Sequence, residues 1–349
     1  MPLADADLID LGNVTLKELG RMKFNQIATR LQNYEIMGRM LKEDKQQFEG
    51  STGLQRTLLI DHSGAAKMVG QFQQDTVNVT DQTVLMSIPW RHATTNYAYE
   101  RREMLMNKGA AKIVDLIKIR RADAMISLAE LMEAQGWSKP ADSNDKVNAF
   151  GVKYWVVKNL TAGFNGGNPA GFTAGAGNID SSAVTRWANY TDGYTSVTKP
   201  DLIDKMRTAA RKIMFKSPVS IEDFRKGAGD TFRIYVNEPT IKAMESVGEQ
   251  QNENLGRDIA AYDGTITFRK NPITWVPKLD ADSDNPVYML NFGWMNPVFL
   301  EGDYMRESSP MVPSYQHNVF VIHVDLTWNL ICTNRRAQAV LATGVANAA

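Results

Sequence analysis

The 349-residue chain is long enough for a sizeable core and for two domains. Its 39 Lys and Arg residues balance 39 Asp and Glu residues, so it lacks the basic excess typical of dedicated nucleic-acid-binding proteins. The single cysteine, Cys332, excludes an internal disulfide and suits a reducing compartment. Residues 1–10 lack the apolar run of a signal peptide, and no stretch approaches the roughly 18 consecutive apolar residues of a membrane-spanning helix. We therefore expect a soluble protein that is made inside a cell and has no membrane partner.

The first element expected after the acidic start is an amphipathic helix. Thr15 and Glu18 have the spacing of a capping box, and the helix is expected to end near Gly50. Five apolar or aromatic residues lie on one face of it: Phe24, Ile27, Leu31, Tyr34 and Leu41. A short strand is expected at 57–60.

Two extended segments, 67–79 and 83–99, are expected to form a hairpin that turns at 80–82. Both are rich in polar residues, so the hairpin needs a neighbouring surface to lie on. Trp90 and Arg91 place a large aromatic ring and a cation on its second strand, a combination typical of contacts with a partner. We predict that both contact a neighbouring subunit. The alternative is a self-contained sheet in which Trp90 covers its own core.

Arg101 and Arg102 mark the turn from this hairpin into one long helix, and they are also predicted to contact a neighbouring subunit. From 104 to 135 there is no proline, and apolar residues recur three or four positions apart, as on one buried helical face. At 1.5 Å per residue this helix is roughly 48 Å long. Gly136 is expected to end it.

The remaining elements are shorter. A strand is expected at 153–158, followed by a glycine-rich tract at 163–177. A second helix is expected to begin at Thr198, with Pro200 in its first turn. One more helix and four strands should follow: the helix 239–251 and the strands 231–236, 265–269, 273–276 and 287–291.

The clearest strand pattern is the last one, at 320–330. Apolar residues alternate with polar ones, which predicts a half-buried strand. Trp328 is the largest residue on the apolar face, and we predict that it lies in the core. Segregated helices and antiparallel strands, without a repeating strand-helix-strand order, favour the α+β class.

No catalytic or metal-binding motif emerges from the sequence. The four histidines have no carboxylate or cysteine at metal-ligand spacing: His62, His92, His317 and His323. The glycine-rich tract lacks the lysine of a phosphate-binding loop and the third glycine of a dinucleotide fingerprint. Cys332 follows a predicted core strand, where a thiol acts as a small apolar group. We expect neither an enzyme nor a cofactor.

Three alternating aspartates, Asp280, Asp282 and Asp284, have the spacing of the first ligands of a calcium loop. However, Asn285 and Asn291 stand where that loop requires glycine and glutamate. We therefore interpret the segment as a solvated turn between strands. Arg335 and Arg336 are too few for a nucleic-acid patch. A chain of this size with no site, but with protruding elements, is typical of a protein that binds copies of itself.

Several sequence blocks resemble the major capsid proteins of tailed bacteriophages with the Hong Kong 97 fold. The first block is 177–182 (GNIDSS) with 186–189 (RWAN), which is similar to a segment before the family's second helix. The second is 265–280 (TITFRKNPITWVPKLD), followed by 286–291 (PVYMLN). The third is 328–341 (WNLICTNRRAQAVL), similar to the family's C-terminal signature. The blocks follow the family's order, after an expected hairpin and long helix.

The resemblance implies five parts in this chain. An N-terminal arm would occupy 1–53, an extended loop and the entry to a peripheral domain 54–103, and the spine helix with the peripheral domain 104–229. An axial domain would occupy 230–314. Residues 315–349 would return to the peripheral domain, with a C-terminal segment that rejoins the axial one.

The resemblance also implies function and partners. The chain would self-assemble into pentamers and hexamers of an icosahedral shell that encloses double-stranded phage DNA and binds it non-specifically. Its partners would include a portal protein and decoration proteins, with either a separate scaffolding protein or none. It would be made in the host bacterial cytoplasm and end in the virion. Two alternatives stay open: an encapsulin, which shares the fold, and an enzyme, which would need a pocket of converging reactive groups.

Overall fold

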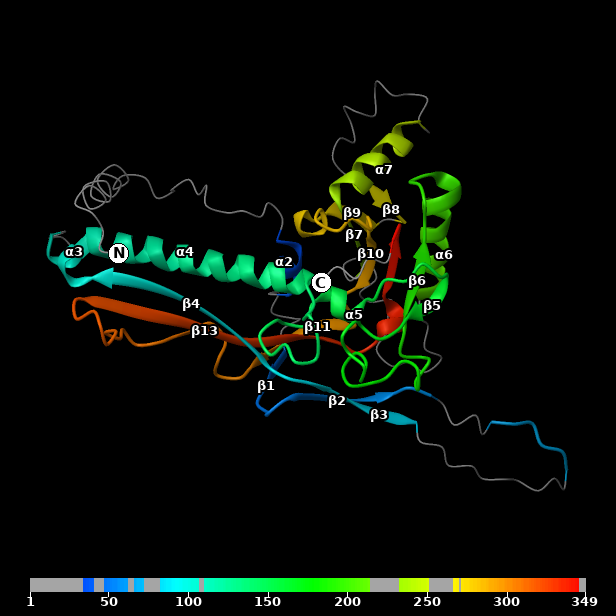
Figure 1. Cartoon of the computed structure of the whole chain (residues 1–349), viewed down its shortest axis with the longest axis horizontal. Helices are drawn as coiled ribbons and strands as arrows, with labels where there is room; N and C mark the ends of the chain where they lie inside the picture. The colour runs from blue at the N-terminus through cyan, green and yellow to red at the C-terminus, as the bar shows by residue number, and fades with distance from the viewer. Residues whose placement is uncertain are drawn as a thin grey trace.

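The computed structural model describes residues 34–40, 47–61, 66–71, 82–106, 110–213, 232–250, 266–269 and 271–344. Figure 1 shows a long arm, in which helix lies along strand, joined to a body with a second sheet. Within the described ranges, no helix combines the length and the apolar character that would let it span a bilayer.

The arm contains the long helix that the sequence predicts. Helix α3 covers Arg101–Met106 and helix α4 covers Ala110–Trp137, while 107–109 lie outside the described residues. The predicted end of the helix at Gly136 is wrong, because α4 continues through it to Trp137. Gly136 lies against α2 (Glu35–Met40), and a Cβ at this position would come within 3.0 Å of Ile36 Cγ2. The glycine therefore permits close helix contact and does not stop the helix.

A five-stranded sheet lies along α4 (Figure 1). Its centre is β13 (Val319–Cys332), which pairs antiparallel with β4 (Arg91–Glu100), β11 (Met295–Leu300) and β12 (Arg306–Glu307). Strand β1 (Gln47–Glu49) pairs parallel with β11. The predicted strand 320–330 is confirmed within β13. Side chains on its helix-facing side, with partners on α4, form the arm's part of the core: Val324, Leu326, Trp328, Ala124, Leu128 and Met132.

The predicted hairpin pairing is wrong for the part of the hairpin that the structure describes. The segment 83–99 forms two strands, because β3 (Thr83–Ile88) ends before Pro89 and β4 begins after it. Proline has no backbone N–H to donate, which favours this break. Strand β3 pairs antiparallel with β2 (Leu54–Leu59), and β4 pairs with β13 instead. Residues 72–81 lie outside the described residues, and 66–71 form no strand.

The body is a seven-stranded sheet in the order β5-β6-β14-β10-β7-β9-β8. The strands, in that order, are Gly163–Gly166, Asn189–Gly193, Ala339–Ala342, Val287–Asn291, Phe232–Val236, Asn271–Trp275 and Thr267–Phe268. Helices α6 (Asp204–Ile213) and α7 (Glu238–Gln250) lie beside it in Figure 1. Its core combines sheet and helix side chains, including Ile234, Met289, Leu341, Leu202, Met206 and Ala210.

Most of the predicted elements of the body are confirmed. Strand β10 matches its predicted bounds, and the predicted helix at Thr198 begins with a π-turn, Lys199–Ile203, that leads into α6. The predicted strand at 153–158 is wrong, since Val152–Trp155 form a single helical turn, α5. Most of the predicted N-terminal helix lies outside the described residues, which include α2. The predicted end of this helix near Gly50 is wrong, because Gln47–Glu49 form strand β1.

Both large sheets take strands from several parts of the chain. Residues 230–314 contribute β7 to β10 to the seven-stranded sheet, but β11 and β12 to the five-stranded one. The seven-stranded sheet also receives β5 and β6 from the preceding part, and β14 from the C-terminal part. Helices and mostly antiparallel strands give a mixed helix-and-sheet architecture.

Candidate inter-subunit surfaces

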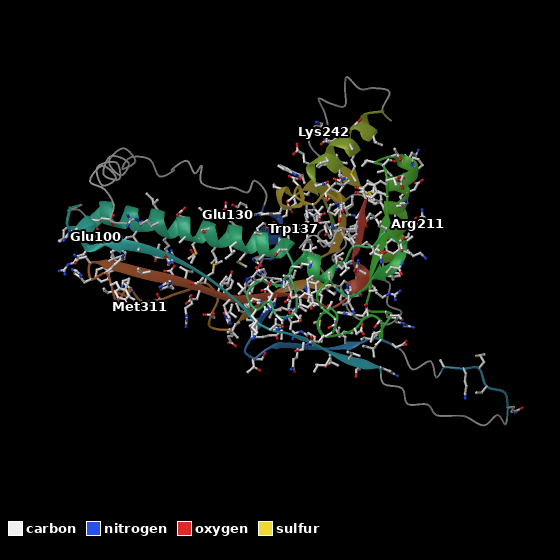
Figure 2. The ribbon with its side chains drawn as sticks, viewed as in Figure 1. Glu100, Glu130, Trp137, Arg211, Lys242 and Met311 are labelled. Carbon is white, nitrogen blue, oxygen red and sulfur yellow. The ribbon has the colours of Figure 1, made fainter. Side chains whose placement is uncertain are left out.

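The free end of the arm, which we call the tip, exposes apolar and basic side chains together. Arg101 and Arg102 at the start of α3 are both exposed, and the Arg101 N–H donates to the Asn318 carbonyl at 2.9 Å. This bond holds α3 against the loop that leads into β13. Four apolar or aromatic side chains are exposed here: Leu105 (61%), Met311 (51%), Val312 (48%) and Tyr315 (99%). Figure 2 labels Met311 and Glu100 at this end of the molecule.

Trp90 and Arg91 lie far from the tip, and their side chains form hydrogen bonds within their own chain. The indole Nε1 of Trp90 donates to the Ser51 carbonyl at 2.7 Å, and its half-buried ring packs on the core. The alternative considered for Trp90, a cover over its own core, agrees with these contacts. The predicted inter-subunit contact of Arg91 stays a prediction, and within the single subunit only 7% of this residue is exposed.

The guanidinium of Arg91 is occupied inside its own chain. Its Nε donates to the Asn148 carbonyl at 2.8 Å and its Nη2 to the Asp145 carbonyl at 2.7 Å. Its carbon Cζ lies 5.2 Å from the centre of the Phe150 ring, a cation–π distance. Burial lowers the pKa of Arg91 from its ordinary value. The residue therefore joins β4 to the 145–150 loop, and the alternation of β4 alone could not reveal this.

Strands β2 and β3 form a two-stranded ribbon with one buried and one exposed face. Leu54, Met86 and Ile88 are fully buried against the core. The opposite face exposes Leu59 (72%) and Leu85 (52%). Figure 1 shows this ribbon at the edge of the body, at the opposite end of the molecule from the tip. The molecule thus carries exposed apolar side chains at both ends.

Trp328 lies in the core, where it is 2% exposed. The other face of β13 is less exposed than the alternating pattern suggests, because Thr327 and Asn329 are fully buried. The Asn329 amide donates to the Pro89 carbonyl at 2.8 Å and accepts from the Phe150 N–H at 3.0 Å. Polar residues on this strand therefore join neighbouring loops to it.

The aspartate segment is a turn between strands, as interpreted, but Asp280 is the only one of its three aspartates that is exposed. Asp282 and Asp284 are 3% and 5% exposed, and the Lys158 ammonium lies 2.9 Å from Asp282 Oδ1 and 2.6 Å from Asp284 Oδ2. Lys153 lies 3.2 Å from Asp282 Oδ2. Burial would raise the pKa of Asp282, but the two ammonium groups outweigh it and hold the pKa below its ordinary value. Among the described residues, no group of three His, Cys, Asp or Glu is arranged to hold a metal.

Arg335 is a second buried cation that the sequence did not distinguish from its neighbour Arg336. It is fully buried, and its guanidinium donates to the carbonyls of Trp155, Trp187 and Gly167 at 2.8 to 2.9 Å. Burial lowers its pKa to about 10, which leaves it charged at neutral pH. Arg335 therefore joins α5, the glycine-rich tract and the start of β6.

No protein-family model matches the sequence, and the curated proteins include no match. The fold, in contrast, matches shell subunits over nearly its whole length. The cyanophage A-1(L) capsid subunit has a TM-score of 0.63 at 11% identity, over 95% of this chain and 99% of its own. This chain has the fold of a phage capsid protein.

Two further matches show how widely this capsid-protein fold is used. The capsid of a native GTA particle has a TM-score of 0.53 at 13% identity, over 93% of this chain and 96% of its own. An encapsulin from Synechococcus elongatus also has a TM-score of 0.53, at 11% identity, over 98% and 96%. The capsid-protein fold therefore confirms the resemblance found in the sequence blocks, and it does not by itself choose between a phage capsid and an encapsulin.

Proposed function

We propose that this chain is the major capsid protein of a tailed bacteriophage, with the Hong Kong 97 fold. In this proposal it self-assembles into pentamers and hexamers of an icosahedral shell that encloses double-stranded DNA. The observation that carries the proposal is that the whole chain, and not one domain of it, has the fold of shell subunits. A structural role in the virion, without catalysis, follows from this proposal.

The exposed surfaces support self-assembly. Large apolar side chains such as Tyr315 and Leu59 face solvent at opposite ends of the subunit. Exposed apolar patches of this kind mark protein contacts, and different patches at the two ends favour head-to-tail contacts that close into rings. Arg101 and Arg102 remain proposed contacts, and Trp90 is proposed only as a support for the ribbon. The contact of Arg91 also stays a prediction.

The five proposed parts are adjusted to the observed sheets. The long arm of Figure 1, which contains α4, β4 and β13 and is distinct from the N-terminal arm 1–53, is assigned to a peripheral domain. The seven-stranded sheet is assigned to an axial domain that meets its copies around symmetry axes. The proposed partners are a portal protein, a scaffolding protein, decoration proteins and DNA bound non-specifically. The zero net charge of the chain fits a shell that encloses DNA without a strong overall electrostatic attraction to it.

An encapsulin is the second candidate, because an encapsulin shell is among the structural matches. The two differ in what the shell encloses. A phage capsid encloses DNA that a portal admits, and an encapsulin encloses protein cargo. Neighbouring genes for a portal and a packaging motor would favour the phage capsid, whereas an enzyme that copurifies inside the shell would favour the encapsulin.

The test is assembly of the purified chain. Electron microscopy and light scattering should detect capsomers or closed shells tens of nanometres across. Circular dichroism on the same sample checks that the subunit is folded. A folded protein that stays monomeric at high concentration, with or without a candidate scaffolding protein, would contradict the proposal.

A further inference from the structure

Part of one face of the five-stranded sheet is polar and open to solvent. The α4-facing side of β4 and β13 is buried, as Trp328 and Val324 show. The opposite side exposes His92 and Thr94 on β4, and Asp325 on β13 is half-buried. Arg306 on β12 pairs with Asp325 and lies on the same side, with 63% of its side chain exposed. We call this surface the open face. The side chains named here are polar or charged, so the hydrophobic effect does not require another surface to cover them.

The open face contains a cavity of about 320 Å³ with a negative character. Asp303, Asp325 and Arg306 line it, so these three side chains together carry one negative formal charge. The Thr327 hydroxyl, which is fully buried, donates to Asp303, and it lies 2.7 Å from His92 Nδ1. These contacts fix the Asp303 carboxylate at the floor of the cavity.

The carboxylates of the cavity retain capacity to accept another cation. Arg306 Nε lies 3.5 Å from Asp303 Oδ1, and Nη2 lies 3.4 Å from Asp325 Oδ2. Charge-assisted hydrogen bonds in proteins are usually shorter, about 2.7–2.9 Å. Each carboxylate can accept about four hydrogen bonds. A second guanidinium could therefore bind here without displacing Arg306.

The tip supplies such a cation. Arg101 is exposed, and no ion pair involves its guanidinium among the described residues, whereas Arg102 lies 4.0 Å from Glu100. Basic side chains at the start of a helix gain nothing from its dipole, which favours acidic residues there. A cation placed against this local preference suggests a contact outside the subunit.

Arg101 cannot reach the cavity of its own chain. Glu100 pairs with Val319, and Asp325 lies six residues further along β13. At about 3.3 Å per residue, this separation is roughly 20 Å, which exceeds the length of an arginine side chain. A contact between the two sites must therefore join two copies.

We propose that Arg101 of one copy binds between Asp303 and Asp325 of a second copy. This contact rests on the proposed shell function, and it specifies which surfaces of the subunits meet. The partner is a second copy because each chain carries both halves of the contact, the Arg101 cation at the tip and the carboxylates of Asp303 and Asp325 in the cavity. Such complementarity sets the register of subunits and excludes wrong contacts.

A charge exchange tests the pair. Arg101→Glu and Asp325→Arg, made separately, should each raise the protein concentration needed for half-maximal assembly by about tenfold, because each places like charges together. The double variant should restore assembly to within about threefold of the wild type, as expected for residues in contact. Arg211→Glu on α6 changes an exposed cation elsewhere and should leave assembly unchanged. Arg101→Gln and Asp325→Asn repeat the test with smaller changes if a reversal impairs folding.

The outcomes separate the two proposals. Wild-type shells together with normal assembly of Arg101→Glu would overturn the pair and leave the shell function intact. A double variant no better than the single ones would also overturn the pair. An equal loss with Arg211→Glu would show that net charge, and not this contact, controls assembly. Wild-type protein that never assembles would overturn the shell function, and the pair with it.

Discussion

The Ile36 side chain lies directly on Gly136 of the long helix, where a Cβ would come within 3.0 Å of Ile36 Cγ2 and 3.1 Å of Cδ1. Ile36 is fully buried, and its N–H donates to Glu133 Oε1 at 3.3 Å. Tyr34 beside it donates to Glu130 Oε1 at 3.1 Å. The short helix α2 is therefore fixed on the last turns of α4 by one tight apolar contact and two hydrogen bonds.

This contact predicts that Gly136→Ala lowers the free energy of unfolding when residue 36 is isoleucine and raises it when residue 36 is alanine. Alanine favours a helix over glycine by about 1 kcal/mol, but overpacking against Ile36 should cost about 1–3 kcal/mol. The substitution should therefore destabilise the wild type, and should stabilise an Ile36→Ala background by about 1 kcal/mol. Denaturant unfolding of the wild type, the two single variants and the double variant gives the four free energies of this double-mutant cycle. Equal stabilisation in both backgrounds would show that α2 does not pack here.

Trp328 predicts a large loss of stability on truncation. Trp328→Ala should lower the free energy of unfolding by about 3–5 kcal/mol, because it removes a buried ring and leaves a cavity. The matched control is Tyr315→Ala, which removes a ring that is 99% exposed and should change the stability of the unassembled subunit by less than about 0.5 kcal/mol. Melting and urea unfolding compare the two variants, and similar losses would contradict the burial of Trp328.

The sequence predicted those helices and strands whose formation depends on the local pattern of apolar and polar residues. The long helix and the alternating strand around Trp328 were correctly predicted, the strand from its regular alternation and the helix from a long run without proline. The apolar face expected on the helix is only partly buried, since Leu128 is 1% exposed but Leu131 is 41% and Leu105 is 61% exposed. The turn at 152–155 was wrongly predicted as a strand, since a short apolar run fits a helix as well. The break at Pro89 was readable from proline chemistry, but the partner of β3 was not, because strand pairing depends on distant segments.

The two buried charge clusters were unpredictable for the same reason. Asp282 and Asp284 look solvated until Lys158, 124 residues earlier than Asp282, is brought beside them. Arg335 and Arg336 are adjacent in sequence, yet only Arg335 is fully buried. Local pattern cannot distinguish two neighbouring arginines when carbonyl groups from separate segments decide which one is buried. The hydrogen bonds from Arg91 to the carbonyls of Asn148 and Asp145 were unpredictable for the same reason.

The lysine–aspartate cluster predicts a strong effect of removing its shared cation. Lys158→Met leaves Asp282 and Asp284 with Lys153 as the remaining ammonium of the cluster, and it should cost about 3–5 kcal/mol because a buried charge loses its partner. Lys146→Met is the matched control, since Lys146 is exposed and forms no ion pair among the described residues. Urea unfolding at neutral pH should separate the two variants clearly, and a small effect of Lys158→Met would show that the cluster is hydrated.

The cluster also predicts how this cost depends on pH. The pKa of Asp282 is held below 3.8 in the folded protein, so its stabilising contribution is present above pH 3.8 and is lost as the pH falls further. The difference in unfolding free energy between wild type and Lys158→Met should therefore shrink in acid. A difference that stays constant from neutral pH to well below pH 3.8 would contradict the ion pairs.

Cys332 provides the last prediction, because burial raises the pKa of its thiol from 9.0 to about 12. The folded protein keeps this proton more tightly than the unfolded chain, so the contribution is complete below pH 9 and is lost as the pH rises towards 12. The stability of the wild type should then fall more steeply above pH 9 than that of Cys332→Ala, in which this titration is absent. A thiol reagent at neutral pH should label the protein only as it unfolds, since the reactive thiolate is suppressed and covered. Rapid labelling of the native subunit, with parallel pH profiles for the two proteins, would show that the thiol is accessible and that β13 ends outside the core.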